Sequence, residues 1–234
     1  MAEAQNIITV DAGDINSGNM LEMTPELTLT PDTLITVPIG YKAELIVDGV
    51  HVATQRACQK KKLIRILGAG AEGKTFSALF VKKRRFSNIS WGIGSLTIRY
   101  EFLEGFFLNV GASGTLSAEI TKPVEFYRSL GLNGAGRIGV NECTSIIVST
   151  FRVLASKILS GMFTEASQPI FETDFLVDEM HRRLAVEVCG QDDAVSAPGV
   201  TPGILFSSAE VGAICVNETD KQRFIARFGV KRRR

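Results

Sequence analysis

The stretch LGAGAEGKTFSALFVK, residues 67–82, decides between two folds. It contains Gly-x-x-x-x-Gly-Lys-Thr, the pattern of a phosphate-binding loop, from Gly68 to Thr75. Such a loop needs a helix directly after the Thr, because backbone N–H groups at the helix N-terminus hold the phosphates. Residues 76–82 instead alternate in the β manner, without a helical stripe. We therefore expect strands at 61–67 and 76–82, joined by a glycine-rich loop, and keep a P-loop-like nucleotide binder only as an alternative.

A second glycine motif, GAGRIG at 134–139, satisfies the dinucleotide fingerprint Gly-x-Gly-x-x-Gly. The fingerprint has to follow a strand. Here it follows residues 123–130, where Val124, Tyr127 and Leu130 have helical spacing. We expect a loop between two helices at 134–139, and we expect no cofactor.

The composition is that of a soluble globular protein, with 45% apolar and 22% charged residues in 234. No apolar stretch approaches the ~20 residues of a membrane-spanning helix, and the first residues lack a signal-peptide pattern, so we expect a cytoplasmic protein. The histidines, His51 and His181, have no Gly-x-Ser-x-Gly elbow to serve, which argues against an enzyme. The cysteines are too far apart for a metal site and are expected to be buried hydrophobes: Cys58, Cys143, Cys189 and Cys215.

Charge is distributed unevenly along the chain. The first 41 residues hold six acids and no Lys or Arg, whereas residues 42–99 hold twelve Lys or Arg against three acids. Basic clusters attract anionic surfaces or an acidic segment of a neighbouring subunit. No aromatic residues are interleaved with them, so we expect no sequence-specific nucleic acid. The candidate contacts are Lys60, Lys61, Lys62, Lys82, Lys83, Arg84, Arg85, Lys231, Arg232, Arg233 and Arg234.

Residue patterns predict strands first, then helices, then a returning strand. Residues 34–54 indicate a strand pair with a turn at Pro38–Gly40 and a hairpin turn at Asp48–Gly49. This order is typical of an α+β fold with a mainly antiparallel sheet and packed helices. We divide the chain into an extended acidic arm (1–34), one α+β domain (35–228) and a basic tail (229–234). The further strands are expected at 95–102, 106–120 and 204–216, and the helices at 123–130, 140–163, 169–189 and 218–228.

Two runs of residues carry a family likeness. Trp91, Gly92 and Gly94 form a Trp-Gly-x-Gly turn before a strand. Gly114, Ile120, Pro123 and Phe126 follow in a run that leads into a helix. These runs resemble the SPFH domain (stomatin, prohibitin and flotillin, also called Band 7), and in particular its soluble bacterial, virion-core-protein-like subgroup.

The resemblance implies a non-enzymatic scaffold that assembles with itself into a ring or cage and associates peripherally with anionic membranes. The alternative is a structural subunit of a closed shell, cage or phage-type particle. The family's membrane hairpin, long coiled coil and zinc ribbon are not expected here, so assembly would use the domain surface. One hypothesis places the arm of one subunit on the Lys82–Arg85 edge of the next. Trp91 is expected to be a packing anchor, in the core or at a subunit contact.

Overall fold

The computed structural model describes residues 9–11, 18–100, 106–165, 173–190 and 198–228, and their antiparallel sheets and helices make an α+β protein, as expected. The chain divides into two compact units that exchange segments along the sequence. Unit 1 holds the described residues up to Arg84 together with Ile120–Ser145, and unit 2 holds Arg85–Glu119 and the described residues from Ile146 onward. The residue pattern predicts a single domain over 35–228. It gives no sign of the boundaries between the two units inside that range.

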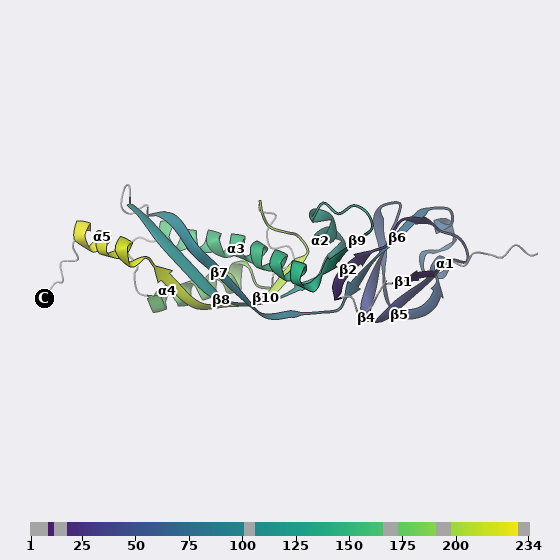
Figure 1. The fold of residues 1–234 in the computed structure, drawn as a ribbon, viewed down its shortest axis with the longest axis horizontal. Coiled ribbons are helices and arrows are strands. Elements are labelled where there is room, and N and C mark those ends of the chain that lie inside the picture. The colour runs from purple at the N-terminus through teal and green to yellow at the C-terminus, as the bar shows by residue number, and fades with distance from the viewer. Residues whose placement is uncertain (1–8, 12–17, 101–105, 166–172, 191–197, 229–234) are drawn as a thin grey trace, which may run out of the picture. The chain divides into compact units, whose positions relative to one another are not determined.

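Unit 1 is built on a seven-stranded sheet of order β1-β4-β6-β2-β9, in which β3 also pairs with β6 and β5 with β4. The pairs are antiparallel except that of β1 with β4, which is parallel. Alternate residues of β4 and β6 point into a core cluster on one face of the sheet. Helix α2 (Pro123–Ser129) belongs to the same unit (Figure 1). The strands are β1 (Thr9–Asp11), β2 (Asn19–Met23), β3 (Leu27–Thr28), β4 (Leu34–Val47), β5 (Val50–Lys62), β6 (Thr75–Lys82) and β9 (Gly136–Gly139).

The hairpin of β4 and β5 turns at Asp48–Gly49, as expected. Both residues have positive φ, 49° and 74°, which is the geometry of a two-residue hairpin turn. The turn expected at Pro38–Gly40 is wrong, because β4 continues through these residues. The chain there makes an irregularity instead: Gly40 has φ +87°, and the register with β5 shifts between Val37 and Lys42.

In the stretch 67–82 the glycine motif is followed by strand β6, which begins at Thr75. The expected strand is confirmed, and no helix follows the motif. The strand expected at 61–67 is wrong beyond Lys62, because Leu63–Leu67 forms the short helix α1. Leu63, Ile66 and Leu67 have the spacing of a helix face, and all contact the core cluster. A 3-10 turn, Ala69–Ala71, completes the connection to β6.

Four segments that were expected to be arm or loop belong to the sheet: β1, β2 and β3 in the expected arm, and β9. Residues 19–23 of the expected arm form β2, which pairs with β6 on one side and β9 on the other. The loop expected at 134–139 is wrong for its second half, because Gly136–Gly139 is strand β9. In this strand the Ile138 side chain is buried, and the neighbouring Arg137 forms an exposed ion pair with Glu22 at 2.9 Å. Successive side chains of β9 therefore lie on opposite faces of the sheet.

Unit 2 contains a three-stranded sheet of order β10-β8-β7, formed by β7 (Phe86–Tyr100), β8 (Phe106–Ile120) and the returning strand β10 (Ile204–Val216). The expected Trp91–Gly94 turn is wrong, because these residues lie inside β7. Helices α3 (Val140–Thr164) and α4 (Thr173–Glu187) run along this sheet (Figure 1), and α5 (Glu218–Phe228) ends the described chain. The helices expected at 123–130, 140–163 and 218–228 are thereby confirmed, as is the described part of 169–189.

Helix α3 carries an apolar face into the core. Phe151 lies 5.1 Å from the Trp91 ring and 5.3 Å from the Phe206 ring, so it joins the helix to two strands of the sheet. The 25-residue helix is also long and apolar enough to cross a membrane by length and composition, with a mean hydropathy of 1.5 over a window that is half buried. The expectation that no such stretch exists was therefore wrong, because Ser and Thr between the apolar residues concealed its overall hydropathy.

Candidate functional site

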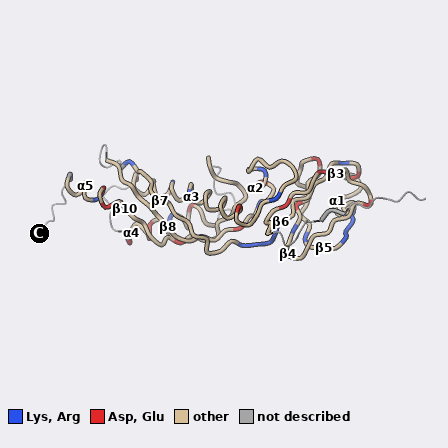
Figure 2. The backbone as a smooth tube through the Cα atoms, viewed as in Figure 1, with Lys and Arg blue, Asp and Glu red and all other residues tan. Residues whose placement is uncertain are grey.

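The first basic cluster lies at the end of β5. Lys60, Lys61 and Lys62 are all exposed, and Lys62 Nζ lies 2.8 Å from Asp32 Oδ1. Figure 2 shows Lys and Arg as blue stretches on β5 and after β6. Part of the acidic N-terminal region thus pairs with a basic cluster of the same chain. Because β2 also lies in this chain's own sheet, the described part of the expected arm is already accommodated within unit 1.

The second basic cluster, Lys82–Arg85, lies where the chain leaves unit 1. Lys82 Nζ is 6.0 Å from the centre of the Tyr41 ring, and the Lys83 backbone N–H donates to Gly40 O at 2.7 Å. That bond places the run beside Ile39, whose side chain is 94% exposed. Arg84 and Arg85 are exposed and stand at the boundary of the two units. The third cluster, Lys231–Arg234, lies outside the described residues.

Trp91 is a buried residue of unit 2 and not a surface residue. It is 3% exposed, its Nε1 donates to Thr115 O at 3.2 Å, and its ring meets that of Phe151 edge-on. Its packing inside the unit leaves little of the ring to contact another subunit.

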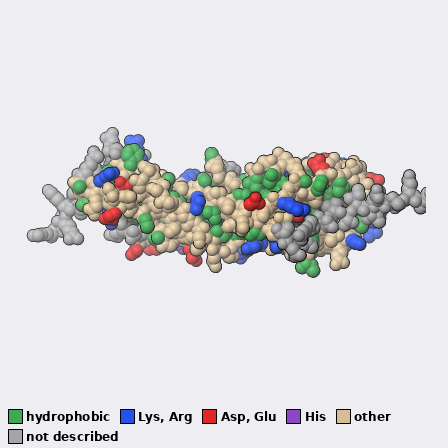
Figure 3. Space-filling model, in the orientation of Figure 1, with side chains coloured by type: hydrophobic (Ala, Val, Ile, Leu, Met, Phe, Trp, Pro, Cys, Tyr) green, Lys and Arg blue, Asp and Glu red, His purple; other side chains and the backbone are tan. Residues whose placement is uncertain are grey.

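The hairpin of β4 and β5 exposes three large apolar side chains, Ile39, Val50 and Val52, which we call the hairpin surface. Val50 is 62% and Val52 49% exposed, and the described part of unit 1 shows no other exposed large hydrophobic residue. Over the described residues, β5 pairs with β4 alone, so one edge of this 13-residue strand has no strand beside it. No acidic residue occurs between Val50 and Lys62. Figure 3 shows Lys and Arg in small groups among hydrophobic side chains on one face of the molecule.

A pocket of about 340 Å³ opens in unit 1 against the face of the hairpin that points away from the core cluster. Its floor contains Glu44, which is only 3% exposed. The Glu44 carboxylate has three partners: Lys42 Nζ at 2.8 Å, His51 Nε2 at 2.9 Å and Thr54 Oγ1 at 2.5 Å. The remaining lining residues come from α2 and the residues before it: Thr121, Lys122, Pro123, Val124, Glu125 and Arg128.

The three partners of Glu44 keep it ionised. Burial by itself raises the pKa of this carboxyl. Hydrogen bonds from Lys42 and Thr54, with the charges of Lys42 and His51, act in the opposite direction and hold the pKa below its ordinary value. A buried carboxylate with three donors fixes the orientation of their side chains, because each donor would lose a charge-assisted hydrogen bond in another rotamer.

A contact between α2 and the hairpin turn holds Arg128, one of the residues that line the pocket. Arg128 Nη2 donates to Gly49 O at 2.6 Å. Helix α2 is itself anchored, because Phe126 and Tyr127 are completely buried and the Tyr127 hydroxyl donates to Gly134 O at 2.9 Å. The pocket walls are therefore held by packing and by hydrogen bonds on both sides.

The glycine motif does not have the surroundings of a phosphate-binding loop. Lys74 Nζ lies 3.7 Å from Asp48 Oδ2, and the Thr75 backbone N–H donates to Asp48 Oδ1 at 3.1 Å. A carboxylate thus occupies the position beside the two groups that would hold phosphates. Among the described residues, no group of three or more His, Cys, Asp or Glu side chains could hold a metal ion.

Sequence reasoning overlooked the pocket, although part of its signal is visible. The Asp48–Gly49 turn predicts a register that sets Ala53 opposite Glu44, and an irregularity between Leu45 and Ile46 shifts that register so that Thr54 lies opposite Glu44. Alternation along β4 then puts Lys42 and Glu44 on one face, away from Ala43 and Leu45 in the core. No residue pattern, however, indicates that α2 would return to this face.

Comparison with protein-family models and with curated proteins finds no match to this chain.

Proposed function

We propose that the protein is a non-enzymatic scaffold that associates with further copies of itself through the hairpin surface. One observation supports this above all: the exposed large apolar side chains described in unit 1 all lie on the β4–β5 hairpin, beside a strand edge with no partner strand. Long exposed edges accept a further strand. The resemblance to SPFH proteins, which assemble into rings or cages, agrees with the same function.

The charge pattern of β5 limits how a second copy can pair with it. If the halves next to the turn pair antiparallel, Ala53 faces its counterpart and Val50 faces Arg56. Lys60, Lys61 and Lys62 then extend past the partner's turn and do not face one another, which avoids like charges in register. Such a contact is symmetric, so it forms a pair from which a larger particle is built through other surfaces.

A non-enzymatic role agrees with the hydrogen bonds of the described histidines. His51 is hydrogen-bonded to Glu44, and His181 lies exposed on α4. Neither histidine is hydrogen-bonded to a Ser or Cys in the described part of the chain, as an activated nucleophile would require.

Particle mass in solution tests the proposal. Light scattering behind a sizing column, without lipid and at low and high salt, should show an assembly larger than the 25.4 kDa chain. Val50→Lys and Val52→Lys should each reduce the mass or shift the equilibrium toward the single chain. Val186→Lys on α4 is the matched control, because Val186 is 61% exposed and lies in unit 2.

Each result has a distinct meaning. A single chain at both salts contradicts self-association of the isolated protein. An assembly that both hairpin variants leave intact contradicts the hairpin surface as the contact. A large particle of one discrete mass that forms without lipid supports the alternative function, the structural subunit of a closed shell.

A second candidate function is peripheral binding to an anionic membrane. The observation that favours it is the contact between Lys83 and Gly40, which sets the exposed Ile39 side chain beside the Lys82–Arg85 cluster. An apolar side chain that enters the acyl boundary, together with cations that meet anionic headgroups, is a recurring way to hold a protein on a membrane.

Sedimentation with vesicles tests this candidate. Vesicles containing phosphatidylserine should bind the protein in a salt-sensitive way, and pure phosphatidylcholine vesicles should not. Ile39→Ser and Lys83→Gln should weaken binding, whereas Lys74→Gln, which removes an exposed charge elsewhere in unit 1, should weaken it less. Equal binding to both kinds of vesicle would contradict the candidate.

A further inference from the structure

The pocket over Glu44 is not used by either function proposed above. Its residues come from β4, β5, the residues before α2 and α2 itself, all within unit 1. We propose that this pocket binds the phosphate group of a small ligand, through Lys42, Lys122 and Arg128, with His51 as a further donor.

The cationic residues reach the pocket from separate elements. Lys42 belongs to β4, Lys122 precedes α2 and Arg128 lies in the last turn of α2. Among the residues that line the pocket, the acids are Glu44 and Glu125. The lining thus carries three cations, Lys42, Lys122 and Arg128, against these two carboxylates, so its net charge is positive.

Glu44 acts as a positioning residue in this arrangement. It holds the ammonium group of Lys42 and the ring of His51 at the pocket wall, with contacts of 2.8 Å and 2.9 Å. Lys42 has three donors and uses one of them for Glu44. The second ring nitrogen of His51 has no partner in the described chain, and it is a donor when the ring is protonated, since Nε2–H faces the Glu44 carboxylate. Both side chains therefore retain capacity for a ligand while their positions are held.

Arg128 is held in the same way. Its bond to Gly49 O uses one of five N–H donors, and within the described residues no carboxylate forms an ion pair with this guanidinium. A guanidinium fixed by a backbone carbonyl is pre-organised, so less conformational entropy is lost when it binds an oxyanion.

The arrangement fits phosphate better than a carboxylate or a cation. Donors outnumber acceptors, which disfavours a cation. They approach from a strand, a helix and the segment before the helix, as suits a tetrahedral group with oxygens on several sides, whereas a carboxylate presents two oxygens in one plane. The volume of about 340 Å³ lies at the lower end of the range for small-molecule pockets, and Pro123 and Val124 supply an apolar wall for the body of the ligand.

Titration calorimetry at constant ionic strength tests the proposal, with inorganic phosphate and phenyl phosphate as probes. We expect saturable binding at one site per chain, with phenyl phosphate the tighter of the two. Arg128→Gln and Lys122→Gln should each weaken binding at least tenfold. Lys61→Gln is the matched control, because it removes the same charge from an exposed position of unit 1 outside the pocket.

A lipid headgroup is the other source of the same chemistry. Vesicles of phosphatidylcholine with phosphatidic acid separate the two sources. Vesicle binding that phenyl phosphate displaces and Arg128→Gln abolishes assigns the pocket to a lipid phosphate. Binding of phenyl phosphate without such displacement assigns it to a soluble ligand.

Two results would overturn the proposal. One is the absence of saturable binding for both soluble probes and for the vesicles. The other is equal weakening by Lys61→Gln and by the two pocket variants, which would mean attraction by general charge. Thermal melts of each variant establish that it is folded, and Lys122→Gln keeps the test valid if Arg128→Gln loosens the hairpin turn.

Discussion

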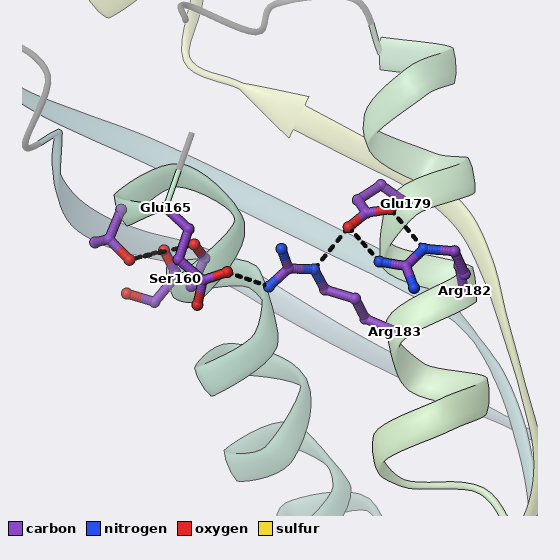
Figure 4. A network of polar contacts seen from close by, with 7 residues as sticks. Ser160, Glu165, Glu179, Arg182 and Arg183 are labelled. Carbon is purple, nitrogen blue, oxygen red and sulfur yellow. Dashed lines mark hydrogen bonds and ion pairs between the residues drawn. The ribbon is translucent and has the colours of Figure 1, made fainter. Parts of the chain in front are cut away.

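Arg183 of α4 donates through Nη1 to Glu165 Oε2 at 2.9 Å, immediately after the end of α3 (Figure 4). The same guanidinium donates through Nε to Glu179 Oε1 at 2.7 Å, one turn earlier on α4. Arg182 makes two hydrogen bonds of 2.8 Å, both to Glu179 of its own helix. Adjacent arginines thus differ in what they connect: one helix to another, or two turns of one helix.

This difference predicts unequal effects on stability. Arg183→Gln should lower the free energy of unfolding by about 1 kcal/mol, near the upper end for solvent-accessible ion pairs, because it removes an interhelical contact as well as a local one. Arg182→Gln should cost less, because its pair lies within one helix and is exposed to solvent. Urea unfolding of both variants measures the two values. A larger loss in Arg182→Gln would contradict the interhelical role of Arg183.

Glu179 should make stability depend on acid pH. Hydrogen bonds from Arg182 and then from Arg183 lower its pKa from 4.5 to about 2. A carboxylate with a depressed folded pKa contributes stability that is fully present above 4.5 and is lost as the pH falls toward 2. Glu179→Gln should therefore make the urea midpoint depend less on pH between 4.5 and 2. Above pH 6 the slope of the midpoint against pH should be the same in the variant and the parent. If the slope of the urea midpoint against pH between 4.5 and 2 is the same in Glu179→Gln and the parent, other carboxyl groups cause the pH dependence.

Gly114 on β8 should tolerate no side chain. A Cβ at this position would lie 1.9 Å from Glu210 O of β10 and 3.1 Å from the Trp91 ring. Gly114→Ala should therefore push two strands apart and destabilise the protein by about 1–3 kcal/mol or more. Gly94→Ala is the matched control, since a Cβ there meets no heavy atom within 4 Å. Near-ultraviolet circular dichroism and thermal melts compare the two, and equal melting temperatures would refute the close approach of the strands.

The cysteines should differ strongly in reactivity. Burial, followed by the charge of Glu142, raises the pKa of the Cys143 thiol to about 12, and its side chain is completely enclosed. Cys215 is exposed on β10, so the expectation that all four cysteines are buried is wrong for it, and Cys58 and Cys189 are half-buried. At pH 8 a disulfide reagent should therefore label Cys215 quickly and Cys143 only after unfolding, because the thiolate is the reacting form. Cys215→Ser should remove the fast phase of labelling; a fast phase that survives this change would contradict the prediction.

The glycine motif at 68–75 should not bind nucleotide. Asp48 lies beside Lys74 and Thr75, and a strand follows them in place of a helix. We expect no measurable retention of ATP with magnesium by equilibrium dialysis, and no difference between the parent and Lys74→Ala. ATP binding that Lys74→Ala abolishes would restore the nucleotide-binding alternative.

The sequence by itself determined most of the local structure. Alternation along Phe76–Lys82 was sufficient to replace a phosphate-binding loop with a strand, and Asp48–Gly49 was sufficient to place the hairpin turn. The apolar stripe of α3, with Phe151 among its residues, was visible as a helix face that had to pack on something. Each of these signals depends on neighbours close in the chain, whose geometry is set by backbone sterics and side-chain periodicity.

Only the tertiary structure decided the rest. β9 is a strand because β2, more than a hundred residues earlier, supplies its hydrogen-bond partners, and no property of Gly136–Gly139 alone predicts this. The division into two units and the pocket over Glu44 likewise depend on segments that meet from distant parts of the sequence. A buried carboxylate such as Glu44 is stable only where its partners converge, and that convergence is a property of packing and not of local pattern.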